Sequence, residues 1–332
     1  MQAISDVFAS VFGGGDWAAP IFDAAKYRYP NSGSYARGDP YPQLFHHYPQ
    51  LKSFYFSEWE REYDPEPVLN IMKNNNYMLP VISVILYALF IFVVGPWYMK
   101  DKKPFVLKYE LAAWNLFLSS FSFYGASRTV PWMIYRIMNE SFEDTVCKSA
   151  HVAFGGGTAG LAVQLFILSK IPELVDTVFL VLKKKPVIFL HWYHHITVLL
   201  YCWNSYVTES AAGLYFVAMN YSVHAVMYFY FFLMAIRAVP KWFPPIILTV
   251  FQISQMIVGT SVVCACIYYH YYGTKTYTYA LTTTGCSNTM TNLYCGGVMY
   301  ASYLYLFVEF AFKRFFFGIN DYEKKGDKKK TA

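Results

Sequence analysis

The chain has 332 residues, of which 56% are hydrophobic, 20% aromatic and only 14% charged, with a formal net charge of +6. Water-soluble domains carry about 25% charged residues, so this chain has too little charge to cover a soluble globule. Together with a mean hydropathy of +0.26, the composition excludes an ordinary soluble enzyme and indicates an integral membrane protein.

Residues 1–76 precede the first long hydrophobic block and are rich in Tyr, Pro and Ser. They lack the basic start of a cleavable signal peptide and contain the run Gly13, Gly14, Gly15. We therefore expect a polar, lumenal N-terminal extension, with the first crossing acting as its own insertion signal.

The rest of the chain alternates long hydrophobic blocks with polar, basic or proline-bearing breaks. A bilayer core of about 30 Å needs roughly 20 helical residues for each crossing. The blocks predict crossings at 77–99, 107–130, 160–182, 187–206, 211–236, 244–270 and 295–318. They are continuous and do not alternate as barrel strands do. The predicted fold is all-α, with a seven-helix membrane domain over 77–319 and a lysine-rich tail over 320–332.

Basic residues favour the cytosolic face of a membrane protein. With seven crossings, every basic cluster falls on one face: Lys100, Lys102 and Lys103; Lys183, Lys184 and Lys185; Arg237 and Lys241; Lys313, Arg314 and the tail. The opposite loops, 131–159, 207–210 and 271–294, are poor in Lys and Arg. The N-terminus is therefore expected in the lumen and the C-terminus in the cytosol.

Several features suit this orientation. Asn139 begins an Asn-Glu-Ser glycosylation pattern. Cys147 and Cys286 lie in two different lumenal loops, where an oxidising compartment allows them to pair. Lys329 and Lys330, the fourth and third residues from the end, resemble a dilysine retrieval signal of the endoplasmic reticulum, although a solvated basic tail is the alternative. We expect the endoplasmic-reticulum membrane.

Polar residues also occur inside the crossings, where each is costly unless it faces a partner or a watery cavity. Four stripes share a helix face by their spacing: Lys170, Glu173 and Asp176; His191, His194 and His195; Asn220, His224 and Tyr228; Thr249, Gln252 and Gln255. At about 1.5 Å per residue, all four lie between the cytosolic side and the midplane. This common depth predicts one polar cavity that opens to the cytosol.

Structural roles compete with this interpretation. Asn220, Gln252 and Gln255 are able to join helices by hydrogen bonds, and Lys170 with Glu173 can be a simple buried ion pair. Three imidazoles on one turn, however, make a poor packing element.

Two chemistries fit the histidines. His-x-x-His-His resembles one box of the membrane di-iron desaturases and hydroxylases, but only His191, His194, His195 and His224 lie at the shared depth, too few for two irons. A single metal with four nitrogen ligands remains possible. The second chemistry is acyl transfer, in which one imidazole attacks a thioester and another acts as a base. Nearby amides and a phenol would stabilise an oxyanion or enolate, and the basic rim would attract a CoA ester.

At this point four motifs, in order, resemble the ELO family of very-long-chain fatty acid elongases, the 3-oxoacyl-CoA synthases. Lys170–Thr177 matches K-x-x-E-x-x-D-T, and Phe189–His195 contains the histidine box HWYHH. Asn220–Tyr230 matches H-x-x-M-Y-x-Y-Y and its preceding Asn, except that Phe231 replaces the final Tyr. Thr249–Gln255 matches T-x-x-Q-x-x-Q. Position 231 lies on the same helical face as His224, so the replacement of Tyr by Phe231 implies that a hydroxyl group is lost near the site.

The resemblance implies condensation of an acyl-CoA with malonyl-CoA, giving 3-oxoacyl-CoA, CoA and CO2 without a metal or other cofactor. It implies that six of the seven helices surround a narrow acyl tunnel and that a disulfide joins Cys147 to Cys286. His194 would accept the acyl group and His191 and His195 would position it, while His224 would handle malonyl-CoA. The remaining motif residues would bind the enolate (Asn220, Tyr228, Gln252 and Gln255) or order the site and its mouth (Lys170, Glu173 and Asp176).

The box HWYHH resembles elongases that prefer saturated and monounsaturated chains. Expected partners are the ketoacyl reductase, dehydratase and enoyl reductase of the elongation cycle, with a possible homodimer and no nucleic acid. A seven-helix receptor is the non-enzyme alternative, but it gives no reason for the histidine box. A metal-dependent desaturase or hydroxylase is the enzymatic alternative.

Overall fold

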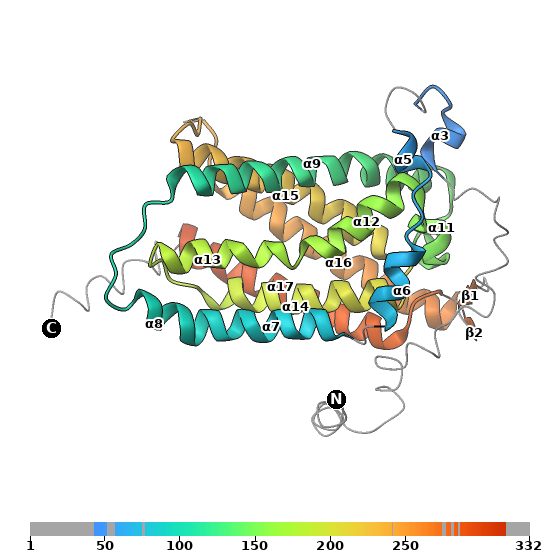
Figure 1. The fold of residues 1–332 in the computed structure, drawn as a ribbon. Coiled ribbons are helices and arrows are strands. Elements are labelled where there is room, and N and C mark those ends of the chain that lie inside the picture. The colour runs from blue at the N-terminus through green and yellow to red at the C-terminus, as the bar shows by residue number, and fades with distance from the viewer. Residues whose placement is uncertain are drawn as a thin grey trace, which may run out of the picture.

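The computed structural model describes residues 43–51, 57–74, 77–240, 242–273, 277–279, 282–284 and 286–316. Long helices run side by side and form a bundle (Figure 1). In chain order they are α7 (Met78–Leu89), η1 (Phe90–Val94) and α8 (Gly95–Met99); α9 (Lys108–Asn139); α12 (Gly157–Ser169), η2 (Pro172–Leu174) and α13 (Val175–Leu182); α14 (Phe189–Val207); α15 (Gly213–Ile236); α16 (Ile246–Tyr272); and α17 (Met290–Ala311) with η3 (Phe312–Phe316).

Helix occupies each of the predicted crossings, and four segments are long and apolar enough to span a membrane: Met78–Met99, Gly213–Ile236, Ile246–Tyr272 and Met290–Phe315. Two boundaries differ from prediction. Helix α9 continues through Pro131 to Asn139, past the expected end at 130. The segment 160–182 is broken between α12 and α13, where Pro172 removes a backbone donor from the helical ladder.

The described residues depart from an all-helical fold at one hairpin. Strands β1 (Tyr277–Tyr279) and β2 (Thr282–Thr284) pair antiparallel, with Tyr277 opposite Thr284. This hairpin lies in a connection that the sequence predicted as a loop, so it leaves the membrane bundle entirely helical.

Helix α12 packs against α9, α14 and α15. It is predominantly apolar and has no water-facing polar stripe, as expected of a buried helix, and most of its residues are buried. Around it, α9 and α15 approach closely at Gly125 of α9, where an added Cβ would come 2.2 Å from the Tyr221 ring. Glycine is therefore required for this helix contact.

The described part of the N-terminal extension packs onto one end of the bundle. It forms α3 (Leu44–His47), α5 (Glu58–Arg61) and α6 (Glu66–Asn74), and it places Leu44, Phe45, Leu69 and Met72 in the apolar core. Gln43 donates to Arg61 O at 3.0 Å and accepts from Thr158 N at 2.9 Å, beside Gly157, whose φ of +59° favours glycine. The sequence predicted a polar extension and did not foresee this packing.

The same end carries α10 (Phe142–Cys147) and α11 (Ala150–Phe154). A disulfide joins Cys147 of α10 to Cys286, which precedes α17, with their Cα atoms 4.4 Å apart. Asn288 reinforces the link by donating its side-chain amide to Val146 O at 3.0 Å.

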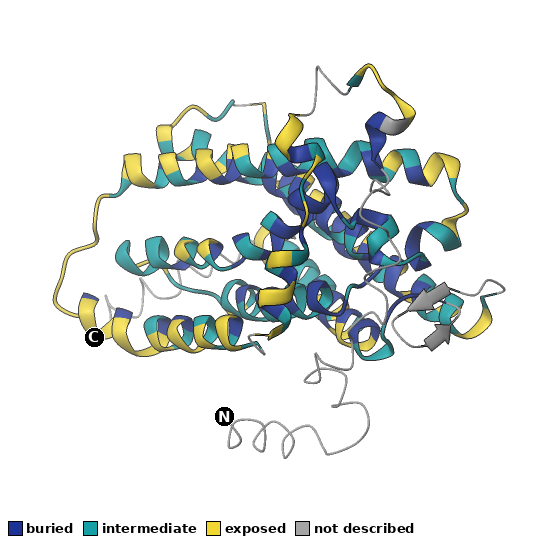
Figure 2. Cartoon of the chain, turned by 45° about the vertical axis from the view of Figure 1, so that its right-hand side comes forward, coloured by how far each residue is buried: buried dark blue, intermediate teal, exposed yellow. Residues whose placement is uncertain are grey.

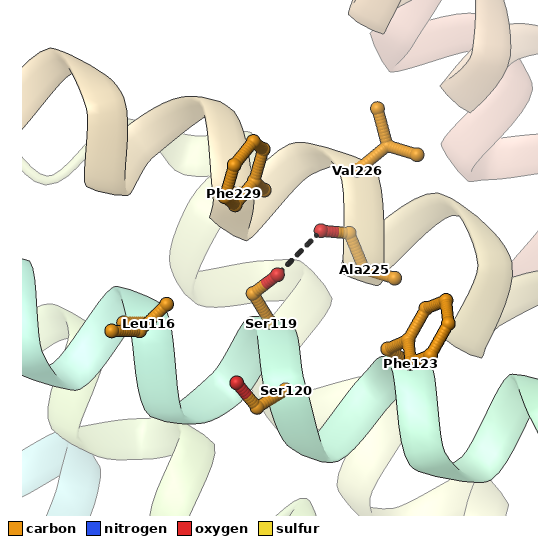
Figure 3. Close-up of a pocket in the computed structure, with 7 residues that line it drawn as sticks. All are labelled: Leu116, Ser119, Ser120, Phe123, Ala225, Val226 and Phe229. Carbon is orange, nitrogen blue, oxygen red and sulfur yellow. Dashed lines mark hydrogen bonds between the residues drawn. The ribbon is translucent and has the colours of Figure 1, made fainter. Parts of the chain in front are cut away.

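Burial differs along the bundle. Figure 2 shows more intermediate and exposed residues toward α8 and the start of α9 than at the end covered by α5 and α11. The first turns of α14 follow this pattern, because His191, Trp192, Tyr193 and His194 are all only half-buried. The histidine segment therefore lies in the less tightly packed half of the molecule.

Candidate active site

A buried ion pair lies at the junction between α12 and η2. Lys170 Nζ is 2.7 Å and 2.9 Å from the two carboxylate oxygens of Glu173, and the two residues are only 2% and 5% exposed. Ser169 donates its hydroxyl to Glu173 Oε1 at 2.9 Å. Charges this deeply buried are retained only when they are paired and hydrogen-bonded, and both conditions are met here.

Helix α15 continues this network. Asn220 Oδ1 accepts from Lys170 Nζ at 3.3 Å, and Asn220 Nδ2 lies 3.2 Å from His224 Nε2. One turn further, the Tyr228 ring is perpendicular to the His224 ring, with centroids 5.3 Å apart. The predicted stripe of Asn220, His224 and Tyr228 is therefore buried on one helix face and is connected to the ion pair.

Asp176 of α13 receives two hydrogen bonds from other helices. Tyr228 OH donates to Oδ2 at 2.7 Å, and Trp114 Nε1 of α9 donates to Oδ1 at 2.6 Å. Sequence reasoning missed Trp114, because a single indole in an apolar block has no periodic signal.

The histidine box lies on the first turns of α14. The rings of His191 and His195 have centroids 4.5 Å apart, and those of His194 and His195 are 5.6 Å apart. His191 Nε2 is 2.8 Å from the hydroxyl of Thr177, which in turn is 2.8 Å from Tyr87 OH of α7. Helices α7 and α13 thus fix the orientation of His191.

His194 is contacted from α17, a helix in which the sequence predicted no site residue. The ring of Tyr303 lies 5.0 Å from the His194 ring, and its hydroxyl donates to His194 O at 3.2 Å. Tyr303 is only 2% exposed. Its neighbours Tyr300 and Tyr305 share its residue type, so composition alone could not single it out.

The two groups of contacts lie in the same region of the bundle, since His194 is within electrostatic range of His224, Lys170, Glu173 and His191. The glutamines of α16 are less directly connected. Gln252 Nε2 donates to Met227 Sδ at 3.3 Å, and Gln255 is buried at 7% exposure. In the described part of the chain neither amide is hydrogen-bonded to a histidine.

Within the described ranges, no three His, Cys, Asp or Glu side chains are arranged to hold a metal ion. The arrangement combines two half-buried imidazoles, His191 and His194, and two buried ones, His195 and His224, with a neutral amide and a phenol near a buried ion pair. These groups are suited to acyl transfer and to enolate stabilisation.

The remaining predicted features fall outside this cluster. Phe231 is 40% exposed, whereas Tyr228 on the same helix is 4% exposed, so the expectation of a hydroxyl lost near the site needs correction. Asn139 ends α9 with an exposed side chain that donates to Tyr135 O. Lys329, Lys330 and the tail over 320–332 lie outside the described residues, as do residues 1–42.

Comparison with known proteins gives a consistent result. The family model described as ELO, the GNS1/SUR4 family, matches residues 72–330. The chain is 40% identical over 264 residues to fatty acid elongase 3 of Trypanosoma brucei brucei, covering 71% of this chain and 83% of that protein. It is 43% identical over 230 residues to very long chain fatty acid elongase 4 of Trypanosoma cruzi (68% and 76% covered). It is 37% identical over 262 residues to human very long chain fatty acid elongase 6 (78% and 92% covered). The chain therefore belongs to the ELO family.

Proposed function

We propose that this protein is the condensing enzyme of fatty acid elongation, an acyltransferase that joins an acyl-CoA to malonyl-CoA and gives 3-oxoacyl-CoA, CoA and CO2. Membership of the family and the elongase names of its relatives support this activity. The observation that supports it best is that His194 of the histidine box lies within electrostatic range of His224 and of the Lys170–Glu173 ion pair, although the box and the ion pair come from different helices.

In the first half-reaction, a ring nitrogen of His194 attacks the acyl thioester carbon. The carbon–sulfur bond breaks, the other ring nitrogen gives up its proton, and the thiolate leaves as CoA thiol. His191 and His195 position the nucleophile, with Thr177 holding His191. The product of this step is an acyl-imidazole on His194.

In the second half-reaction, malonyl-CoA loses CO2 and its α-carbon attacks the acyl group. The bond to His194 breaks, and the imidazolate recovers a proton from water. His224 contacts the malonyl group, with Asn220, Tyr228, Gln252 and Gln255 around the enolate. Lys170, Glu173 and Asp176 order the site and its mouth.

The proposed setting is the endoplasmic-reticulum membrane, with all seven predicted crossings spanning it and six of them around a narrow acyl tunnel. The N-terminus and the Cys147–Cys286 disulfide are then lumenal, and the C-terminus with Lys329 and Lys330 is cytosolic. The 3-oxoacyl product requires a reductase, a dehydratase and an enoyl reductase to complete the cycle. Peptide mass mapping without reductant, which should find Cys147 and Cys286 in one cross-linked pair, tests the disulfide.

The deciding experiment is malonyl incorporation by the purified protein in detergent, with a panel of acyl-CoAs and a metal chelator. Products two carbons longer, as 3-oxoacyl-CoA, would support condensation without an added metal. Absence of product with every acyl-CoA, with activity recovered on adding iron, would instead support the desaturase or hydroxylase alternative.

His194 is tested separately by intact mass after incubation with acyl-CoA alone. Wild-type protein should gain one acyl group, and a folded His194→Ala variant should gain none. A covalent acyl adduct in that variant would remove His194 from the role of nucleophile.

A further inference from the structure

Asn220 lies between a group that can only donate hydrogen bonds and a histidine. A lysine ammonium has three donors and no acceptor. Lys170 Nζ lies 3.3 Å from Asn220 and makes its shorter contacts with Glu173. The side of the Asn220 amide that faces Lys170 must therefore be the oxygen, since the nitrogen would place donor against donor.

This orientation fixes the other end of the amide. Asn220 Nδ2, which can only donate, is directed at His224 Nε2 at 3.2 Å. His224 Nε2 must then accept, so it carries no hydrogen. The ring is neutral, and its one hydrogen is on Nδ1.

The Nδ1 hydrogen remains available. Among the described residues, the only hydrogen bond of His224 is the one between Nε2 and Asn220. The ring is 8% exposed, and its other close ring neighbour, Tyr228, is perpendicular to it at 5.3 Å. Nδ1–H is thus a fixed donor for which the described residues supply no acceptor, at the position where the second substrate is proposed to bind.

We infer that His224 acts as a neutral hydrogen-bond donor through Nδ1–H, not as a base, and that Lys170 sets this tautomer through Asn220. This inference rests on the proposed function. As malonyl-CoA decarboxylates, the bond between its carboxylate carbon and α-carbon breaks, CO2 leaves, and the electron pair moves into the enolate. The enolate oxygen receives the hydrogen bond, and the proton stays on His224. Lys170 and Asn220 are positioning residues in this step.

The tautomer is tested without any reaction. Nitrogen-15 NMR of protein labelled at histidine, compared with the spectrum of His224→Asn, identifies the His224 signals. We expect Nδ1 to give the signal of a protonated nitrogen and Nε2 that of an unprotonated one. The reverse pattern, or a doubly protonated ring at neutral pH, would overturn the inference whether or not the protein condenses acyl chains.

Kinetics test the role. The side-chain nitrogen of asparagine is bonded to Cγ, as Nδ1 of histidine is, so asparagine can donate a hydrogen bond from near the Nδ1 position. The side-chain nitrogen of glutamine lies near the position of the histidine Nε2 instead. We therefore expect His224→Asn to condense a preformed acyl-enzyme faster than His224→Gln does, because His224→Gln should lose about 10²–10³-fold in kcat, the usual effect of removing one oxyanion donor. Acyl-enzyme formation should be normal in both variants. Equal loss in the two variants, with acyl-enzyme still formed, would contradict a donor role; absence of acyl-enzyme in wild-type protein would instead contradict the proposed function.

Asn220→Asp provides the matched positioning test. A carboxylate cannot donate a hydrogen bond, so the introduced side chain would accept one from His224 Nε2–H. The hydrogen of the neutral ring would then be on Nε2, and Nδ1 would be unprotonated. We expect the nitrogen-15 signals of His224 to exchange their character and kcat to fall, with KM for malonyl-CoA little changed. Unchanged signals in a folded Asn220→Asp protein would show that Asn220 does not set the tautomer.

Discussion

Lys170 and Glu173 pair with each other inside the bundle, with the ammonium 2.7 Å and 2.9 Å from the two carboxylate oxygens. Breaking such a pair from one side leaves a buried charge without a partner, at a cost of about 3–5 kcal/mol. We therefore expect Lys170→Met or Glu173→Leu alone to lower the unfolding temperature in detergent strongly. The double variant should recover much of this loss but not the activity. A double variant as unstable as the singles would mean that packing, not the unpaired charge, governs stability here.

Tyr303 holds the turn of α14 that carries His194. Tyr303→Phe keeps the ring contact at 5.0 Å and removes the hydroxyl, which donates to His194 O and also contacts the Thr197 hydroxyl on the same helix. A neutral hydrogen bond contributes about 1 kcal/mol, so the rate of acyl-enzyme formation should fall about fivefold. Tyr300→Phe is the matched control, because Tyr300 is also buried but stacks on Phe216. Equal effects of the two substitutions on this rate would contradict a specific role for Tyr303.

Phe231, the departure from the third motif, is 40% exposed and should have little influence on the reaction. Restoring the family residue with Phe231→Tyr is expected to leave kcat/KM within about twofold, as for an exposed substitution away from special contacts. Tyr228 lies on the same helix as Phe231, and its hydroxyl donates to Asp176 Oδ2. Tyr228→Phe removes this hydrogen bond and should therefore reduce kcat/KM clearly. A gain of tenfold or more in Phe231→Tyr would place that side chain at the site after all.

The sequence predicted the helices and the polar stripes because both follow from spacing. Lys170 with Glu173, and Asn220 with His224, recur at helical intervals inside apolar blocks, where polar residues are otherwise costly. Trp114 and Tyr303 could not be predicted this way, because aromatic residues are common in membrane helices and only tertiary packing brings these two to Asp176 and His194.

The limits of prediction at the helix ends and the N-terminus have similar causes. The crossing predicted over 107–130 ends just before Pro131, yet α9 passes through this proline to Asn139. The polar composition of the N-terminal extension predicts no packing, because only a few of its residues are apolar side chains that enter the core of the bundle. Glu60, a charged residue in a polar stretch, is only 2% exposed because it packs against α9, where Arg128 binds its carboxylate. Arg128 lies 68 positions further along the chain, so the residues around Glu60 give no sign of this burial.

Glu60 links the N-terminal extension to α9 and makes this contact sensitive to pH. Its Oε1 accepts from Tyr124 OH at 2.6 Å, and Arg128 Nη2 forms an ion pair with it at 3.2 Å. Burial alone would raise the pKa of Glu60, but the hydrogen bond from Tyr124, the charge of Arg128 and the bonds from Ser57 together lower it below the ordinary value of 4.5. The folded protein therefore holds this carboxylate ionised more strongly than the unfolded chain does.

A carboxyl group whose pKa is lower in the folded protein than in the unfolded chain stabilises the fold at any pH above its unfolded pKa. This stabilisation is lost as the pH falls through the folded pKa. Glu60→Gln should thus melt about 2–4 °C below wild type at pH 7, the shift expected for about 1 kcal/mol in a domain of 150–250 residues. The difference should shrink on acidification below pH 4.5, as wild-type Glu60 also becomes neutral. Glu58→Gln, the same change at an exposed position of α5, should melt like wild type at pH 7. A Glu60→Gln deficit that does not change with pH would mean that the side chain acts by shape and hydrogen bonding and not by its charge.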